Sequence, residues 1–350
     1  MPRTHHLKLK PLDQQVLLIT GATSGIGLAT AREAARRGAA VMLVARDEDT
    51  LRRTAETIRE TGGQADFAVA DVGDLDDVRR AAARAIERFG RIDSWVNNAG
   101  VAIYAKLADT PIAEHEQLFR TNYFGAVHGA LTALEHMRET GGAIITVASI
   151  ASDIPSPIMG AYAASKHAIK GFIHSLRIEV TADKLPVAIT LLKPSGIDTP
   201  IAEHAANHVD GEALIPVPVY DPSVVAAAIL DAAERPRRDV TVGGGGKLQT
   251  LLGEHFPQAL DHLGRWFEPM LVDKDKARTG SSNLDRPVGN GKVRSSEQSG
   301  RTFSLFTTAA RHPASMVIGI AAASSILLTG ALRRRRQDPS DRRREARSRR

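Results

Sequence analysis

Short apolar runs alternate with longer amphipathic stretches along most of the chain. Runs of about four to eight aliphatic and β-branched residues predict strands that are buried on both faces. They cover residues 16–20, 40–45, 65–70, 92–96, 142–148, 187–192 and 239–242. The stretches between them predict helices over 28–37, 48–60, 75–89, 160–181 and 222–233, and one or two helices within 111–137. This alternation predicts an α/β fold, a doubly wound parallel sheet of Rossmann type.

The pattern changes towards both ends of the chain. Residues 1–13 form an N-terminal tail, and residues 14–246 form the single folded domain. Residues 247–272 have the apolar stripe of an amphipathic helical extension, and residues 273–314 have the polar composition of a linker. Residues 315–332 carry no charged side chain, which makes them a candidate membrane-associating segment at the short end of a spanning length. Residues 333–350 are an arginine-rich tail.

Composition and charge exclude several classes of protein. The content of 43% hydrophobic and 25% charged residues is typical of a globular protein. The absence of cysteine excludes disulfides, thiolate metal sites and thiol catalysis. The net charge is +6, but the tail 333–350, with ten arginines and three acidic residues, contributes +7 of it. The near-neutral remainder argues against a nucleic-acid-binding protein.

A glycine-rich turn follows the first predicted strand. Gly21, Gly25 and Gly27 have the spacing G-x-x-x-G-x-G and stand between a strand and a helix. Glycines allow the backbone to approach a ligand closely, and the N-terminus of the helix provides free N–H groups and partial positive charge. The turn therefore predicts a site for the pyrophosphate of a dinucleotide.

Tyr162 and Lys166 are four residues apart in the helix predicted over 160–181, so both lie on one helix face. A lysine ammonium beside a tyrosine favours the phenolate, and we therefore expect the pKa of Tyr162 to lie below its ordinary value of about 10. Ser149 follows the strand predicted over 142–148, at the end of the sheet where ligands bind in α/β folds. The three residues predict a site that binds a carbonyl or hydroxyl group and exchanges a proton with it.

Together these motifs resemble the short-chain dehydrogenase/reductase family over residues 16–246. The matching motifs are the turn from Thr20 to Gly27, Asp71, the sequence Asn-Asn-Ala-Gly at 97–100, Asn122, and Ser149, Tyr162 and Lys166. The resemblance implies an oxidoreductase in which Tyr162 is the general acid/base and Ser149 polarises the substrate oxygen. Lys166 would hold the nicotinamide ribose, and Asn122 would position a water that links Lys166 to bulk solvent.

The resemblance also implies the set of residues that contact the cofactor. These are Gly21, Thr23, Ser24, Ile26, Arg46, Asp71, Val72, Asn98, Tyr162, Lys166, Pro194, Ile197 and Thr199. The chain departs from the family after the strand predicted over 187–192. The family has Pro-Gly there, and this chain has Pro194, Ser195 and Gly196.

The end of the second predicted strand favours NADP(H) over NAD(H). An acidic residue at this position of the fold binds the ribose 2′-hydroxyl and selects NAD. Here Ala45 stands at that position and Arg46 follows it, and an arginine forms charge-assisted hydrogen bonds with a 2′-phosphate. Asp47 comes next, and we expect it to cap the following helix.

We expect a small carbonyl or alcohol substrate. The resemblance implies that residues 201–220 cover it, and their composition favours an apolar pocket; a surface loop with a short helix is the alternative interpretation of this stretch. The resemblance further implies a homo-oligomer in the cytoplasm, with a candidate membrane contact through residues 315–350. His204 and His208 have helical spacing, but no third ligand is evident, and we expect no metal. The alternative function is a cofactor-binding sensor or membrane-associated scaffold that uses the same fold without turnover.

Overall fold

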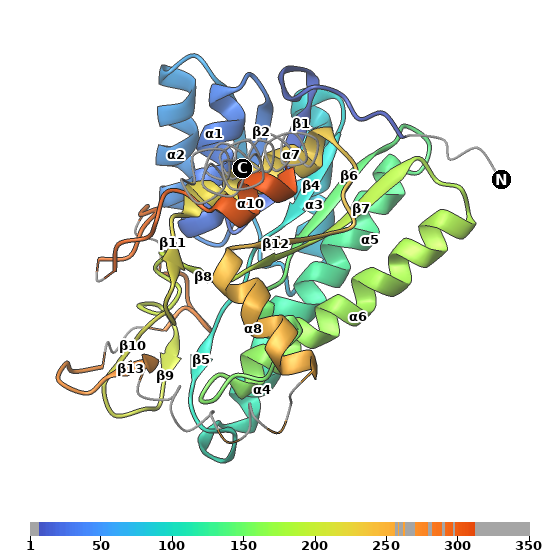
Figure 1. The fold of residues 1–350 in the computed structure, drawn as a ribbon. Coiled ribbons are helices and arrows are strands. Elements are labelled where there is room, and N and C mark those ends of the chain that lie inside the picture. Colours follow the sequence, from blue (N-terminus) through green and yellow to red (C-terminus); the bar gives the residue numbers. More distant parts are fainter. Residues whose placement is uncertain are drawn as a thin grey trace, which may run out of the picture. The chain divides into compact units, whose positions relative to one another are not determined.

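The computed structural model describes residues 7–255, 258, 262, 270–278, 282–288, 291–296 and 298–311 (Figure 1). The chain divides into two units, Met1–Thr307 and Thr308–Arg350. The fold and the site below belong to the first unit. The second unit is described only where the helix α10 (Leu305–Arg311) enters it.

A parallel sheet of seven strands in the order β12-β7-β6-β4-β1-β2-β3 forms the centre of the first unit. The strands are β1 (Val16–Thr20), β2 (Ala40–Ala45), β3 (Gln64–Val69), β4 (Ser94–Asn97), β6 (Gly142–Val147), β7 (Val187–Pro194) and β12 (Asp239–Val242). The chain runs outward from β1 to β3 and then returns to β4 on the other side of β1. The edge between β1 and β4 is therefore the switch point at which α/β sheets bind their ligands.

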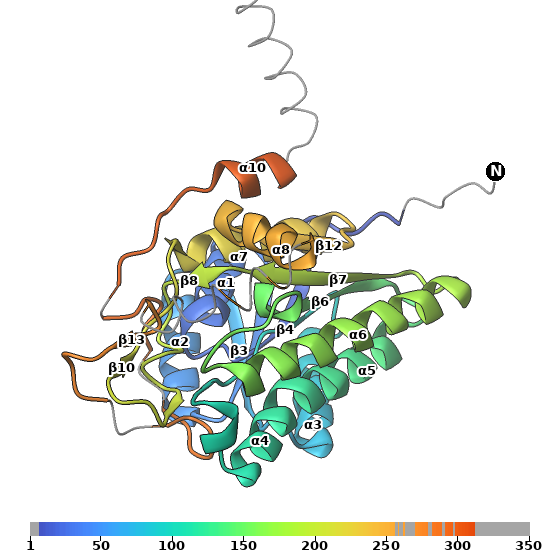
Figure 2. The ribbon, with the colours of Figure 1, turned by 60° about the horizontal axis from the view of Figure 1, so that its bottom comes forward.

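Helices cover both faces of the sheet (Figures 1 and 2). One layer contains α1 (Gly25–Arg36), α2 (Glu48–Glu60) and α7 (Pro222–Glu234), and the other contains α3 (Leu75–Phe89), α5 (Gly125–Met137) and α6 (Gly160–Ala182). The remaining helical segments are η1 (Leu12–Gln14), η2 (Leu107–Asp109), α4 (Ile112–Phe119), the π-helical turn η3 (Arg120–Phe124), η4 (Ile150–Ser152) and α8 (Gly244–His255). Two-residue strands form three small pairs: β5 (Ile103–Tyr104) with β9 (Ala206–Asn207), β8 (Gly196–Ile197) with β11 (Val219–Tyr220), and β10 (Glu212–Ala213) with β13 (Val272–Asp273).

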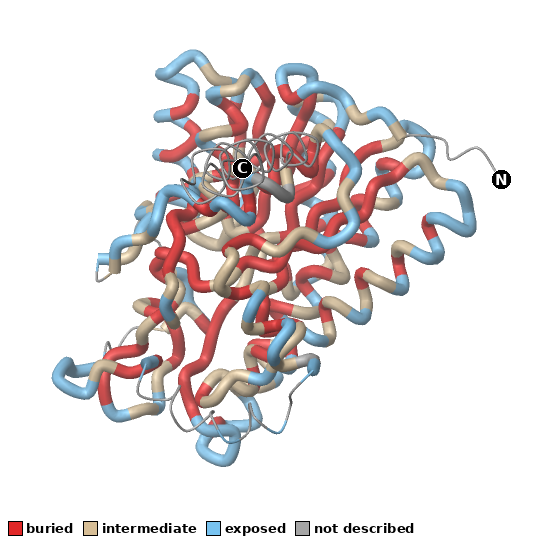
Figure 3. The backbone as a smooth tube through the Cα atoms, viewed as in Figure 1, coloured by how far each residue is buried: buried red, intermediate tan, exposed pale blue. Residues whose placement is uncertain are grey.

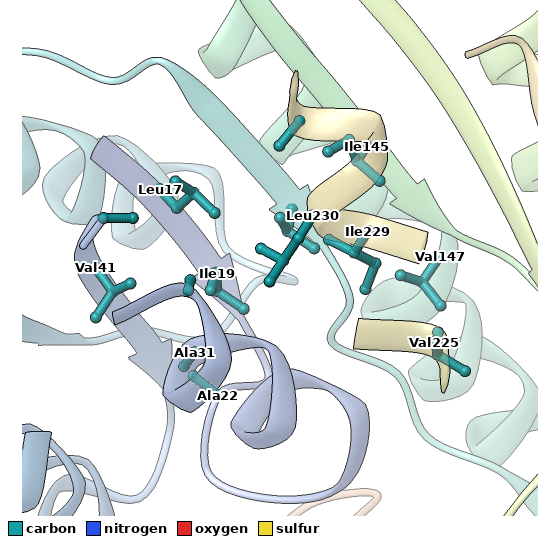
Figure 4. Packing of buried hydrophobic residues seen from close by; sticks show 14 of the residues in the cluster. Leu17, Ile19, Ala22, Ala31, Val41, Ile145, Val147, Val225, Ile229 and Leu230 are labelled. Atoms are coloured by element: carbon teal, nitrogen blue, oxygen red, sulfur yellow. The ribbon is translucent and has the colours of Figure 1, made fainter. Parts of the chain in front are cut away.

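The core lies between the sheet and its two helical layers, and the central strands are buried along their length (Figure 3). Successive residues of β1 point to opposite faces, so Leu17 and Ile19 join one core cluster and Leu18 joins the other. In the first cluster, Ile229 and Leu230 of α7 pack beside the strands (Figure 4). Burial on both faces explains why the strands are continuous apolar runs without polar alternation.

This architecture confirms the predicted α/β, doubly wound, Rossmann-type fold. β1, α2 and α3 have the predicted bounds. β1 is a continuous apolar run, and α2 and α3 begin at the side-chain caps of Asp47 and Asp74. The stretch 111–137 divides into α4, the π-helical turn η3 and α5. The helix α8 begins at Gly244, and one residue separates it from β12.

The domain boundaries after residue 246 stay predictions. The candidate membrane segment 315–332 and the tail 333–350 lie outside the described residues. Within the part of the chain that the structure describes, no helix is long and apolar enough to cross a membrane.

Candidate active site

Ser149 lies where β6 ends and the chain turns towards α6. It caps η4, and its Oγ accepts a hydrogen bond from the backbone N–H of Ala151 at 3.1 Å. Tyr162 and Lys166 come from the first two turns of α6. The strand end and the helix start thus bring the three predicted residues to one side of the sheet.

Lys166 is almost fully buried, with 4% of its surface exposed. Its Nζ donates a hydrogen bond to the carbonyl of Val147 at 3.1 Å and lies 5.4 Å from the centre of the Tyr162 ring. Burial disfavours the charged ammonium and lowers the pKa of Lys166 to about 8. Lys166 is therefore a buried cation held by a backbone carbonyl and the face of an aromatic ring.

Burial raises the pKa of Tyr162 to about 12, although a hydrogen bond with Ser149 acts in the opposite direction. This direction is opposite to the lowering that we expected from Lys166. The expectation considered only the neighbouring charge, whereas in the folded protein the loss of water around the phenol is the larger effect. At neutral pH the Tyr162 hydroxyl is thus a proton donor.

Asn122 lies in the π-helical turn η3 and is 1% exposed. Its Oδ1 accepts from the backbone N–H of Val101 at 2.8 Å, and its Nδ2 donates to the carbonyl of Val101 and to Ser165 Oγ, both at 3.0 Å. A π-helical turn displaces a side chain relative to a regular helix and is frequent at functional sites. Here it lets Asn122 tie the loop after β4 to α6.

The glycine turn after β1 is packed too tightly for side chains. Gly21 has a φ of +66°, and a Cβ on Gly27 would lie 2.2 Å from the carbonyl oxygen of Gly21. Asn98 fixes the turn from the other side of the switch point, since its Nδ2 donates to Thr20 O at 2.9 Å and to Gly21 O at 3.3 Å. The turn is thus a preformed cradle at the N-terminus of α1.

A single cavity of about 600 Å³ joins these elements. Every residue predicted to contact the cofactor lines it, and so does Ser149. Asn122 does not line this cavity; it lines a much smaller one behind it, together with Lys166. The tertiary structure therefore brings the predicted cofactor residues and three of the four predicted catalytic residues to one space.

The polar groups of the cavity fit a dinucleotide. The Oγ1 of Thr121, the Oγ of Ser195 and the Oδ1 of Asn283 are buried and have no hydrogen-bond partner among the described residues. All three residues line the cavity. Buried polar atoms without partners are rare in folded proteins and indicate that a ligand or water completes them.

The sequence analysis missed two of these three residues. Thr121 directly precedes Asn122 in η3, so its position next to a predicted site residue could have indicated that it lies at the site. Asn283 lies in the stretch predicted to be a linker and had no such signal. Ser195 was noted only as a departure from the family. The neighbouring Gly196 has no room for a side chain, because a Cβ there would lie 2.3 Å from Pro216 O.

Arg46 and Asp47 lie at the end of β2 beside the cavity. Asp47 caps α2 by accepting a hydrogen bond from the backbone N–H of Thr50 at 2.9 Å, which confirms the cap expected from sequence. The guanidinium of Arg46 donates hydrogen bonds to the backbone carbonyls of Asn283 and Leu284. An arginine with five N–H donors retains others for a ligand.

A second group of charges, which the sequence analysis did not find, supports the turn that begins at Ser149. The side chain of Asp153 is 2% exposed and accepts from Lys170 Nζ at 2.6 Å and from Lys193 Nζ at 2.7 Å. Burial raises the pKa of Asp153, but the hydrogen bonds from the two lysines outweigh it and hold the pKa below its ordinary value. Asp153 thus connects the end of η4 to α6 and β7.

The histidines at helical spacing do not share a site. His208 Nε2 lies 2.8 Å from Glu114 Oε2. His204 is buried and lines the main cavity, and burial lowers its pKa. Within the described part of the chain, no group of three or more histidine, aspartate or glutamate side chains is arranged to hold a metal ion.

Comparison with known proteins identifies the family. A sequence profile described as short chain dehydrogenase matches residues 15–210, more than half of the chain. The chain belongs to the short-chain dehydrogenase family. The matched region runs from the start of β1 to the residues between β9 and β10, and it contains the glycine turn and all four predicted catalytic residues.

Individual members of the family are also similar to the chain. "Uncharacterized oxidoreductase YxnA" of Bacillus subtilis is 43% identical over 260 residues, which are 73% of each chain. "11-beta-hydroxysteroid dehydrogenase A" of Arachis hypogaea is 32% identical over 259 residues, covering 71% of this chain and 73% of that protein. These relatives establish that the chain is an oxidoreductase of this family.

Solved structures have the same fold. A short chain dehydrogenase/reductase of Burkholderia phymatum in complex with NAD has a TM-score of 0.65 and 26% identity, covering 72% of this chain and 96% of that chain. An alcohol dehydrogenase of Thermococcus sibiricus complexed with 5-hydroxy-NADP has a TM-score of 0.58 and 26% identity, covering 65% of this chain and 95% of that chain. The family therefore includes members bound to NAD and members bound to NADP-type cofactors.

Proposed function

We propose that the protein is an NADP(H)-dependent oxidoreductase that transfers hydride between nicotinamide and an apolar carbonyl or alcohol substrate. The observation that carries this proposal is the single cavity, which is lined at one side by the glycine turn and at the other by Ser149, Tyr162 and Lys166. A pure cofactor sensor has no need of a tyrosine positioned for proton exchange, so the geometry favours turnover over the sensor or scaffold.

Each of the four candidate catalytic residues has a separate role in the proposed reaction. Ser149 Oγ holds the substrate oxygen, and Tyr162 donates its hydroxyl proton to that oxygen during reduction. Lys166 provides positive charge beside Tyr162, and Asn122 fixes the loop and helix on which these groups stand. A bound nicotinamide supplies or accepts the hydride.

The pKa of Tyr162 determines which form of its side chain is present at neutral pH. Because burial raises it to about 12, the neutral hydroxyl that reduction requires is present throughout the physiological range. Oxidation of an alcohol requires the phenolate, so its rate should increase with pH up to the pKa that applies in the complex. We therefore infer that Tyr162 can act as the acid in carbonyl reduction near pH 7.

The walls of the cavity support an apolar substrate. Besides the residues discussed above, the lining contains the polar Ser156, His204 and Gln249 and a larger set of aliphatic, thioether and proline side chains: Ile154, Pro155, Met159, Ile201, Ile215, Met270 and Leu271. A pocket of this composition binds a ligand by burying its apolar surface. Several relatives are named 11-beta-hydroxysteroid dehydrogenase, and a keto or hydroxyl group on a bulky apolar skeleton fits this lining.

The end of β2 supports NADP(H) as the cofactor. Arg46 lines the cavity, and the acid that would bind a ribose 2′-hydroxyl is replaced by Ala45. A charge-assisted hydrogen bond from arginine is worth about 1.5–3 kcal/mol, which is roughly ten- to a hundredfold in affinity.

The variant Tyr162→Phe tests the proposed chemistry, because it removes only the hydroxyl. We expect turnover of a ketone with NADPH to fall by about a hundredfold or more, while the dissociation constant of NADPH stays within about twofold of the unmodified protein. Tyr123→Phe is the matched control, since Tyr123 does not line the cavity, and it should retain activity. Substantial residual turnover in Tyr162→Phe would refute the role of tyrosine as acid.

A further inference from the structure

A segment from the C-terminal part of the chain lines the cavity that contains the predicted cofactor residues. We call its described residues, 282–288 and 291–296, the strap. Asn283, Pro287 and Val288 of the strap line the same cavity as the glycine turn and Tyr162. The strap lies beyond residue 210, where the match to the family profile ends. It is thus an addition to the part of the chain that defines the family.

The strap is anchored in the domain by apolar packing. Leu284 is 2% exposed and belongs to a core cluster with Val101, Leu118 and Ala161. The backbone N–H of Asn283 donates to His204 O at 2.8 Å. Burying the apolar surface of this leucine side chain stabilises the docked strap. The strap is therefore a docked part of the domain.

Two buried carboxylates of the domain accept hydrogen bonds from the strap. Asp198 is fully buried between the predicted cofactor residues Ile197 and Thr199, and its Oδ1 accepts from Ser295 N at 3.0 Å and from Ser295 Oγ at 2.6 Å. Asp221, 2% exposed, accepts from Arg294 Nε at 2.6 Å. A buried carboxylate is costly without partners. Gly300 N also donates to Asp198 Oδ2 at 3.1 Å, so the strap supplies part of the hydrogen bonding that holds the segment with Ile197 and Thr199.

At the cofactor side the strap contacts the residues predicted to bind phosphates. Arg46 donates to the carbonyls of Asn283 and Leu284, and these two acceptors fix the direction of its guanidinium. The backbone N–H of Gly25 donates to Lys292 O at 3.0 Å. The Oδ1 of Asn283 is buried beside Arg46 and has no partner in the described part of the chain.

From these contacts we propose that the strap is part of the cofactor site. The side-chain carboxamide of Asn283 binds a hydroxyl or amine of the adenosine half of the cofactor. The carbonyls of Asn283 and Leu284 position Arg46 for the 2′-phosphate. This inference rests on the proposed function in taking the ligand to be a nicotinamide dinucleotide, and it assigns a binding role to a segment that the sequence pattern marks as a linker.

The first test measures cofactor affinity directly, by titrating the full-length protein with NADPH and with NADH and following their fluorescence. In Asn283→Leu the backbone carbonyls stay and the carboxamide is lost, and we expect both dissociation constants to increase about fivefold, the value of one hydrogen bond. Asp285→Asn is the matched control, because Asp285 is an exposed strap residue that does not line the cavity, and its dissociation constants should not change. Unchanged or tighter binding in Asn283→Leu would overturn the proposal.

The second test uses the absence of cysteine from the natural sequence. In Leu284→Cys, the single thiol lies on the buried side of the strap and reacts with a thiol reagent only when the strap undocks. A cofactor that binds the docked strap makes undocking rarer, so saturating NADPH should slow the reaction about fivefold or more, matching the fivefold change in the dissociation constant expected above. Ala130→Cys in α5 is the control for general stabilisation, because Ala130 is buried far along the chain from the strap. Faster labelling of Leu284→Cys would show that the cofactor displaces the strap, and slowing no greater than that of Ala130→Cys would show no specific contact. Either result would overturn the proposal.

The two proposals fail in different ways. If both cofactors bind and the strap variants leave binding unchanged, the strap has no role in the site and the proposed oxidoreductase function stands. If the strap variants weaken binding but the unmodified protein reduces no ketone, the strap stands and the proposed chemistry fails.

Discussion

The buried ammonium of Lys166 should make the stability of the protein depend on pH. Its pKa is lowered from 10.5 to about 8 by burial. Between these two values the unfolded chain binds a proton that the folded protein does not, so the free energy of unfolding should increase as the pH rises through this window. The full shift corresponds to about 3 kcal/mol. Below pH 8 Lys166 is charged in the folded protein, and the free energy of unfolding is lower by this full amount.

A second group limits the window in which the effect can be measured. Because burial raises the pKa of Tyr162 to about 12, the folded protein retains that proton longer than the unfolded chain, and stability should fall above about pH 10. Between pH 8 and pH 10 the contribution of Lys166 alone should therefore raise the free energy of unfolding by about 2–3 kcal/mol.

The measurement is urea unfolding at several pH values for the unmodified protein and for Lys166→Met, which keeps the length of the side chain and removes its charge. The difference in unfolding free energy between the two should shrink or reverse in sign across the window, since only the unmodified protein gains from deprotonation. Lys106→Met is the control, because Lys106 is exposed, and its curve should stay parallel to that of the unmodified protein. Parallel curves for Lys166→Met would refute the argument from burial.

Two further predictions concern the cofactor site. In Arg46→Ala the ratio of the catalytic efficiency with NADPH to that with NADH should decrease by about ten- to a hundredfold. Ala45→Asp should shift the preference towards NADH. A higher catalytic efficiency with NADH than with NADPH in the unmodified protein would contradict the proposed cofactor preference. Gly27→Ala places a Cβ 2.2 Å from Gly21 O, so it should lower stability by about 1–3 kcal/mol in thermal unfolding. Gly171→Ala in α6, with open space around it, should not destabilise, and a harmless Gly27→Ala would refute the steric argument.

Local sequence patterns determined most of the fold. The bounds of β1 and α2 could be predicted because both depend on short-range features: an apolar run for the strand, and for the helix the cap that Asp47 provides. The alternation of these elements was sufficient for the sheet class, since parallel strands need helical crossovers. Motif spacing and position predicted the glycine turn, Ser149, Tyr162 and Lys166, because neighbouring strand ends and helix starts meet at one edge of a parallel sheet. The other candidate residues came from the resemblance to the family.

Other properties depended on contacts between residues far apart in the chain. The strap has no periodicity, and its hydrogen bonds join Arg46 to Asn283 and Asp198 to Ser295, so composition alone predicted a linker. The pKa of Tyr162 depended on how much water the folded protein removes from the phenol. The sequence spacing between Tyr162 and Lys166 gives no information about that loss of water. Sequence therefore determined the elements and the chemical groups of this protein. Tertiary packing decided which of those groups lose water and which distant segment completes their site, because both follow from burial and long-range contact.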